Sequence, residues 1–378
     1  MSPVPEHTRR WFSYSLRSLF VLITVVSLPL VWVSYERAQS RHELQIVEQL
    51  KTKYENVDIR FVGRFDQPSA FDSSGRLLEP SWWRRTLSAI CGPRVEAVLA
   101  NQNPSLSDLS ALSALRNLEM LSVEETQVSD LSSVAALTNL SALFLNDSQV
   151  SDLTPVAALV LLERLDVEGT HVSDLSPLVG LTHLDTLKLN RSPVHDLTPL
   201  SGLKSLDTLT LGNTPVSNLS ALAGLVNLER LSFRGTQVSD LSPLAGLKNV
   251  WQIECEDTPI SDLVPLASVP YLQVLYADRT KVTDLAPLAA LKLLGDLHVQ
   301  GTAVSDLSPL ANLTNFGRLW LDDTQVSDLT PLANLKNLTE LHVQGTPVSE
   351  EQVKLLQAAL PNCKIFSDFS VRPAPTTP

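Results

Sequence analysis

The sequence is short of the residues that build disulfide frameworks and catalytic sites. It contains three cysteines in 378 residues, too few for a disulfide scaffold, and aromatic residues make up only 6%. No G-x-S-x-G, H-E-x-x-H, paired C-x-x-C, phosphate-binding loop or EF-hand loop occurs, and the seven histidines are scattered. These absences argue against an enzyme and predict no catalytic residue, no cofactor and no metal site.

Basic residues are outnumbered as well. Lys and Arg total 29 against 41 Asp and Glu, which gives a formal net charge of −12. A polyanionic backbone is repelled by such a surface, so nucleic acid is excluded as the expected partner.

The main feature that is present is a 22-residue repeat, which runs eleven times through residues 106–347. Its pattern is L-x-x-L-x-L-x-x-[T/S]-x-V-S-D-L-x-P-L-x-x-L-x-x, with leucine or a close substitute at repeat positions 1, 4, 7, 10, 13, 16 and 18. One repeat alone cannot bury its apolar edge, because ordering about 22 residues costs more than its apolar side chains return. The repeats must therefore stack as a solenoid, one rung per repeat.

Comparing the eleven repeats with one another separates the core from the surface. Position 4 is always Leu, and position 16 is Leu in ten repeats with Ile253 as the exception, whereas position 17 holds nine residue types. Side chains alternate between the two sides of a strand. We therefore expect positions 16 and 18 in the core and positions 15, 17 and 19 on an open strand face.

Two polar positions are nearly constant and have structural explanations. Position 3 is Asp in ten repeats and Asn218 in the other, where a short side chain can bond the free N–H groups of a helical or 3₁₀ turn. Position 21 is always Thr or Ser, whose hydroxyl can bond the turn that leaves each strand. Cys255 at position 18 and Cys363, assigned to position 16 of a partial twelfth repeat, are expected to be buried thiols too far apart to pair.

The first 80 residues predict a membrane anchor and a linker. A short basic tail (1–18) precedes the uncharged segment 19–35, which is just long enough for a transmembrane helix. A cleaved signal peptide is the alternative, although no clean small-x-small site follows. We expect the N-terminus in the cytoplasm and the repeats outside it, in the periplasm or extracellular. Residues 36–80 then hold an amphipathic helix, with Ala38, Leu44, Val47, Leu50 and Tyr54 as its apolar side, a strand at 57–61 and a polar loop at 66–78.

Both ends of the solenoid need caps, since an open end exposes apolar surface. Residues 81–105 predict an N-terminal cap, with Trp82, Trp83, Leu87 and Ile90 on a helix and a strand at 95–99. At the other end, residues 348–366 form the C-terminal cap: Ser349 and Gln352 make a capping box, a helix runs to Leu360, and a last strand lies at 363–366. The Pro- and Thr-rich tail 367–378 is expected to be disordered.

The repeats resemble the bacterial leucine-rich repeats of the internalin type, whose consensus also carries S/T-D-L-x-P-L. The resemblance covers about residues 95–366 and implies a parallel β-sheet on the concave face with helical or 3₁₀ turns on the convex face. Those repeats usually have Asn where this chain has Thr or Ser at position 21. The run RRWFSYSLRSLFVLITVV, with the tryptophan-bearing cap, is similar to membrane-anchored repeat proteins of planctomycete-type bacteria, which implies a surface or envelope protein.

The strand face supplies the candidate binding residues. Position 17 of repeats 8 to 11 carries rings, and carboxylates and an arginine flank them at positions 15 and 19: Tyr276, His298, Trp320, His342, Asp278, Asp322 and Arg318. Aromatic residues with Arg and carboxylates are typical of binding hot spots, whereas stacked rings can also simply stabilise a sheet. Next to them, four acids suit either a Ca²⁺ site or a solvated face: Glu254, Glu256, Asp257 and Asp278.

The favoured function is recognition of another protein through this face. An envelope-structural or glycan-contacting protein is the alternative, in which rings stack on sugars. A hydrolase would need a converging polar pocket near residues 57–95, which the sequence does not show.

Overall fold

The computed structural model describes residues 16–54, 57–62 and 94–369, with residues 16–33, 60–62 and 94 described by their backbone alone. The chain divides into two compact units, Met1–Lys53 with Ile59–Glu96, and Tyr54–Asp58 with Ala97–Pro378. The predicted basic tail up to residue 15, the loop at 66–78, the helix bearing Trp82 and Trp83, Cys91 and the tail from residue 370 lie outside the described residues.

The first unit contains the long helix α1 (Leu16–Lys53), all of β1 (Asp58–Val62) except its first residue, and the beginning of β2 (Arg94–Leu99). The buried side of α1 includes Ile46, Val47 and Leu50, whereas Leu44, predicted to belong to it, is 37% exposed, and Ala38 is exposed too. The true buried side adds Ser40 and Glu43, two polar residues at helical spacing. Glu43 accepts a hydrogen bond from the Val95 amide at 3.0 Å, so a buried acid replaces the expected apolar residue.

No helix within the described part of the chain is both long enough and apolar enough to cross a membrane. Most side chains of the predicted anchor, residues 19–35, are outside that part, although the backbone of α1 continues through it. The anchor therefore stays a prediction.

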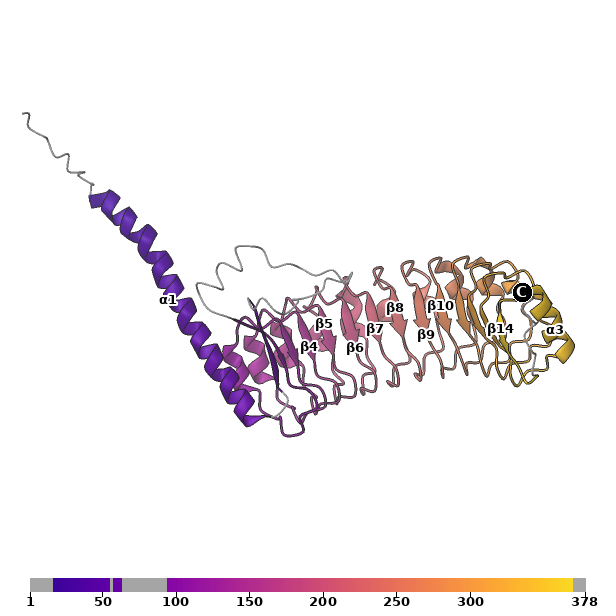
Figure 1. Ribbon diagram of the computed structural model, residues 1–378, viewed down its shortest axis with the longest axis horizontal. Helices are drawn as coiled ribbons and strands as arrows, with labels where there is room; N and C mark the ends of the chain where they lie inside the picture. Colours follow the sequence, from indigo (N-terminus) through magenta and orange to yellow (C-terminus); the bar gives the residue numbers. More distant parts are fainter. Residues whose placement is uncertain (1–15, 55–56, 63–93, 370–378) are drawn as a thin grey trace, which may run out of the picture. The chain divides into compact units, whose positions relative to one another are not determined.

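The second unit is a leucine-rich-repeat solenoid with one short strand and one 3₁₀ turn per repeat (Figure 1). The repeat strands are β3 (Met120–Ser122), β4 (Ala142–Phe144), β5 (Arg164–Asp166), β6 (Thr186–Lys188), β7 (Thr208–Thr210), β8 (Arg230–Ser232), β9 (Gln252–Glu254), β10 (Val274–Tyr276), β11 (Asp296–His298), β12 (Arg318–Trp320) and β13 (Glu340–His342). From β2 onward they pair in parallel and in chain order, with equal repeat positions side by side. The predicted parallel sheet is confirmed.

The turns opposite the sheet are 3₁₀ helices, as predicted. They are η1 (Ser110–Ala114), η2 (Ser132–Ala136), η3 (Thr154–Ala158), η4 (Ser176–Leu178), η5 (Thr198–Gly202), η6 (Ser220–Leu222), η7 (Ser242–Leu244), η8 (Val264–Ser268), η9 (Ala286–Ala290), η10 (Ser308–Leu310) and η11 (Thr330–Leu332). In each repeat the position 3 side chain accepts a hydrogen bond from the amide two residues on, as Asp108 does from Ser110 and Asn218 from Ser220, both at 2.8 Å. The structural explanation of this acidic position is confirmed.

The core holds the leucine positions and the hydroxyls of position 21. Leu209 and Leu319, both at position 16, are 0% exposed, and Cys255 and Cys363 are buried free thiols. The hydroxyl of Thr126 donates to the Val123 carbonyl at 2.7 Å, and the same bond recurs at position 21 in later repeats. Ser148 is the exception, since its Oγ is buried and has no partner among the described residues.

The C-terminal cap consists of α3 (Glu350–Ala359) and β14 (Lys364–Phe366). Ser349 accepts from the Gln352 amide at 3.3 Å, but the Gln352 side chain accepts from Leu329, so only one half of the predicted capping box forms. The pairing of β14 with β13 places Ile365 beside Leu341 and Phe366 beside His342. The assignment of Cys363 to position 16 was therefore wrong, because the capping helix adds two residues to this last repeat.

Candidate binding face

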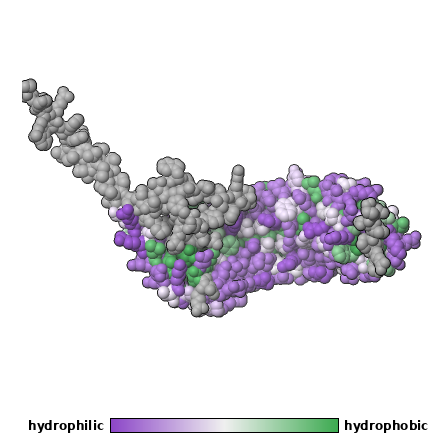
Figure 2. All heavy atoms as spheres, viewed as in Figure 1, coloured by the Kyte–Doolittle hydropathy of each residue, from purple (hydrophilic) through white to green (hydrophobic). Residues whose placement is uncertain are grey.

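The strand face is formed by positions 15, 17 and 19, and large side chains at position 17 reach solvent there. Phe144, Tyr276 and Trp320 are half-buried on this face and do not enter the core. Ser122, Asp166 and Ser232 are buried although they share position 17, since short side chains do not extend past their neighbours. Polar side chains cover most of the visible surface of the repeats (Figure 2). A residue at position 17 thus lies on the strand face, and the length of its side chain determines how far it is exposed to solvent.

Five rings lie in a continuous row along this face. The register sets each position 17 residue beside the next, from Tyr276 through His298 and Trp320 to His342. Ring centroids are 4.3, 3.9 and 4.9 Å apart along that series, and Phe366 extends it at 4.3 Å from His342. We call this row the ring ladder: Tyr276, His298, Trp320, His342 and Phe366.

Two of the four neighbouring ring pairs of the ladder are stacked face to face. Trp320 and His342 lie 13° from parallel, and His342 and Phe366 lie 16° from parallel, so both pairs are stacked. The Tyr276 to His298 and His298 to Trp320 pairs are tilted by 46° and 30°. A ring covered on both sides at this spacing offers its edge, not its face, to a ligand. Stacking of a sugar on an open ring face is therefore disfavoured within the ladder.

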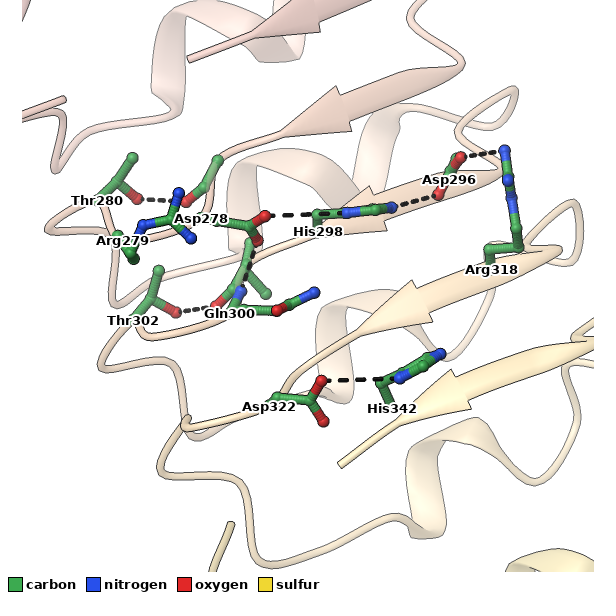
Figure 3. A network of polar contacts seen from close by, with 12 residues as sticks. Asp278, Arg279, Thr280, Asp296, His298, Gln300, Thr302, Arg318, Asp322 and His342 are labelled. Carbon is green, nitrogen blue, oxygen red and sulfur yellow. Dashed lines mark hydrogen bonds and ion pairs between the residues drawn. The ribbon is translucent and has the colours of Figure 1, made fainter. Parts of the chain in front are cut away.

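Two carboxylates flank each histidine of the ladder. Figure 3 shows both of them at His298, and Asp322 at His342. His298 Nε2 lies 3.2 Å from Asp296 Oδ1, and His298 Nδ1 lies 3.9 Å from Asp278 Oδ2. His342 has the same arrangement, with Nε2 3.2 Å from Glu340 Oε1 and Nδ1 3.7 Å from Asp322 Oδ2. Both imidazoles are held between position 15 of their own strand and position 19 of the preceding repeat.

Asp278 and Asp322 also fix the backbone of the next repeat. Asp278 Oδ1 accepts from the Gln300 amide at 2.8 Å, and Asp322 Oδ1 accepts from the Gln344 amide at 2.7 Å. Burial raises the pKa of both carboxyl groups, although the backbone bonds act in the opposite direction. One oxygen of each carboxylate is therefore already used in a hydrogen bond to the backbone of the next repeat.

Arg318 links the rings to the carboxylates. Its Nη2 donates to Asp296 at 2.5 Å, and its guanidinium carbon lies 5.7 Å from the centroid of the Trp320 ring. That distance is within the range of a cation–π contact. All seven predicted face residues therefore lie in one continuous network.

The four acids next to the ladder do not form a cation site. Asp257 pairs with Arg279 at 2.6 Å, and this bond lowers the pKa of Asp257. Burial raises the pKa of Glu256 to about 7. Within the described chain, no group of three or more His, Cys, Asp or Glu is placed to hold a metal.

The strand face of repeats 3 to 6, residues 150–237, has a different chemistry, and we call it the polar half. Lys188 pairs with Asp166 at 3.2 Å, and Asn190 donates to Glu168 at 2.5 Å. Between repeats 2 and 4, Arg191 pairs with Asp147 at 2.9 Å by passing over Gly169. A Cβ at Gly169 would collide with Asp147 Oδ1. This ion pair was not predicted from the sequence, although the glycine at position 20 marks the place where it passes.

The strand face of residues 238–366 is the ring half. Over positions 15, 17 and 19, repeats 7 to 11 carry six carboxylates and one arginine: Glu254, Glu256, Asp278, Asp296, Asp322, Glu340 and Arg318. The same positions of the polar half carry two carboxylates and four basic residues: Asp166, Glu168, Arg164, Lys188, Arg230 and Arg234. The charge of the face therefore reverses along the solenoid.

No protein-family model and no curated protein matches the sequence. Solved structures do match. An internalin, InlF, from Listeria monocytogenes shares 26% identity with a TM-score of 0.70, over 73% of this chain and 87% of that one. A leucine-rich-repeat protein of Leptospira interrogans shares 20% identity (TM-score 0.56; 72% of this chain, 83% of that one).

A plant peptide hormone receptor, RGFR1, solved in complex with RGF2, shares 14% identity with a TM-score of 0.59, over 69% of this chain and 46% of that one. The Listeria internalin InlF and the Leptospira protein thus share the fold, while the planctomycete resemblance stays a prediction. This chain has a leucine-rich-repeat fold that is structurally similar to that of the Listeria internalin.

Proposed function

We propose that the chain is a recognition protein that binds another protein through the ring half of its strand face. The observation that carries this proposal is the ring ladder with its flanking carboxylates and Arg318. Rings and arginine are the residue types that dominate binding energy at protein interfaces. The plant receptor with the same fold was solved with a peptide hormone, which fits this use of the scaffold.

The geometry supports a protein ligand over a glycan. Sugars gain most from rings whose flat faces are open, whereas the ladder covers those faces with neighbouring rings. The ring edges of the ladder, with their hydroxyl and N–H groups, suit the mixed polar and apolar surface of a polypeptide. A glycan array run beside a proteome array tests this preference directly.

The test of the proposal removes two rings. Tyr276→Ala combined with Trp320→Ala is expected to abolish capture of protein partners from native envelope membranes. Tyr271→Ala serves as the matched control, since Tyr271 is 53% exposed but lies outside positions 15, 17 and 19. Unchanged capture of every partner by the double variant, with its unfolding midpoint near that of the parent, would refute the assignment.

We also propose that residues 19–35 anchor the protein in a membrane, with the N-terminus in the cytoplasm and the repeats outside. The proposal rests on the uncharged run and the basic residues before it. Protease added to cells whose outer membrane has been permeabilised should then digest the repeats. Repeats that stay protected until the cells are lysed would reverse this topology.

A further inference from the structure

The ring half repeats its chemistry once, at an interval of two repeats. The second set of side chains has the same roles as the first: Tyr276, Asp278, Asp296, His298 and Gln300, then Trp320, Asp322, Glu340, His342 and Gln344. Each set begins with a large ring, holds its histidine between two carboxylates, and bonds its first Asp to a glutamine amide. We call each set a two-rung module. Position 17 of the polar half carries no ring, so this duplication is confined to the ring half.

The interval between the modules limits the ligand. Adjacent strands are about 4.8 Å apart, so the modules lie about 10 Å apart along the solenoid. A ligand that makes the same contacts with both must present equivalent groups at that distance and in the same direction. Only some regular chains do so.

A polyproline II helix meets both conditions, because it has three residues per turn and advances about 9.3 Å per turn. An extended strand covers a similar length in about three residues, but it points the first and fourth side chains to opposite sides. An α-helix needs two turns, about 11 Å, and its backbone carbonyls are already bonded within the helix. Polyproline II leaves its carbonyls free to accept from the Tyr276 hydroxyl and the Trp320 indole N–H.

Charge sets the remaining chemistry. Asp296 is paired with Arg318, and burial raises the pKa of Glu256 to about 7, so the acidic character of the ring half rests on the other four carboxylates: Glu254, Asp278, Asp322 and Glu340. The stacked ring pairs leave edges and polar tips for contact. A cationic side chain in each turn of the ligand would lie near one module's carboxylates. Aromatic-lined surfaces are a known way to bind proline-rich segments.

We propose that the ring half binds a cationic, proline-rich segment in the polyproline II conformation, with one three-residue turn on each two-rung module. This inference rests on the proposed function, because it names the chemistry of the partner at the same face. The segment runs along the ring ladder, across the strands, and its basic residue recurs every third position.

The test measures binding of labelled peptides to the full chain in mild detergent, by fluorescence anisotropy. One peptide carries four Lys-Pro-Pro triplets, and the other has the same composition with its lysines at irregular spacing. The regular peptide is expected to bind at least about tenfold more tightly, because it engages both modules at once. Equal affinities would overturn the proposal.

Single-ring variants separate the modules. Tyr276→Ala and Trp320→Ala should each lower the affinity for the regular peptide to that of the irregular one, and change binding of the irregular peptide by no more than about twofold. Phe144→Ala, a ring on the same face outside both modules, should leave both affinities unchanged. A variant that weakens both peptides equally would show that the two modules do not act together.

Two further probes decide the class of ligand. Tighter binding of a linear glycan oligomer, or of a basic helical peptide, than of the regular peptide would replace the proposal with that class. Partner capture that depends on Tyr276 and Trp320, without preference for the regular peptide, refutes this inference and leaves the proposed function standing. Ring variants that change neither capture nor peptide binding refute both.

Discussion

The polar half and the ring half of the strand face share one scaffold and carry opposite chemistry. Their leucines are equally buried, as Leu209 and Leu319 show, and their strands pair in the same register. On the surface, the polar half has salt bridges and an excess of basic residues, whereas the ring half has stacked rings and an excess of acids. The repeat fixes where a side chain lies, and leaves its chemistry free. If the two halves differ only at their surfaces, variants at equal positions should show equal effects in the core and unequal effects on the strand face.

The strongest test asks whether the cores are equivalent. Leu209→Ala and Leu319→Ala each remove a fully buried leucine from position 16 and should each lower the free energy of unfolding by about 2–5 kcal/mol. The two losses should agree within about 1 kcal/mol, because the surroundings repeat. Urea unfolding followed by circular dichroism measures both. A larger difference would mean that the halves differ below their surfaces as well.

Removal of a ring should affect stability only in the ring half. Trp320 contacts a ring on either side, so Trp320→Ala should cost about 2 kcal/mol of unfolding free energy. Thr210→Ala, at the same position 17 in the polar half, should cost less than about 0.5 kcal/mol. Thermal unfolding of the two variants checks this. Equal losses would show that the ladder adds nothing to the sheet beyond ordinary packing.

The glycines at position 20 differ between the halves in what lies over them. Gly169 has φ of +66° and lies beneath the Asp147–Arg191 pair, so Gly169→Ala should cost about 2 kcal/mol by combining backbone strain with loss of that pair. Gly301→Ala, at φ of +65°, brings its Cβ 3.2 Å from the Arg279 Cγ, and should cost about 1 kcal/mol. Denaturant midpoints rank the two. If removal of the Arg191 side chain restored the stability of the Gly169→Ala variant, backbone strain at residue 169 would not be a cause of the loss.

The smallest effect concerns pH. Burial raises the pKa of Glu256 from 4.5 to about 7 in the folded state, so the folded chain binds a proton more tightly than the unfolded chain. The free energy of unfolding should therefore fall as pH rises from about 4.5 to about 7. Glu256→Gln should flatten that slope and raise stability at pH 8 by about 1 kcal/mol, after allowance for solvent screening.

Glu168 is the matched residue in the polar half, at the same position 19. Burial raises its pKa too, but Lys188, Asn190 and Arg191 act in the opposite direction. Glu168→Gln should therefore change the pH slope less than Glu256→Gln. Unfolding at pH 5 and pH 8 gives both slopes, and the reverse ranking would contradict the electrostatic difference between the halves.

The 22-residue period was sufficient to predict the solenoid, its parallel sheet and its 3₁₀ turns, because each leucine position has one possible place in a stacked core. It also predicted the hydrogen bonds of the position 3 acids and most position 21 hydroxyls. The failure at Ser148 is a matter of side-chain orientation, which the residue type does not determine.

The repeat pattern predicted which positions form the candidate face, but it did not predict the contacts among their side chains. Phe366 was missed as a ladder residue because α3 shifts the last strand by two residues, and no repeat pattern indicates that shift. The contact of His298 with Asp278 depends on the distance between two repeats, which a single sequence does not contain. Burial of Asp166 at an exposed position also depends on neighbouring side chains.

The acids at position 3 have a further consequence for how copies of the protein meet. Ten of them lie along the edge where the 3₁₀ turns begin, one per rung at about 5 Å spacing. Hydrogen bonds from the following Ser or Thr lower the pKa of several of them, including Asp152, Asp240 and Asp306. This edge keeps its negative charge in mildly acidic solution, so it repels the same edge of a second solenoid and discourages side-by-side aggregation.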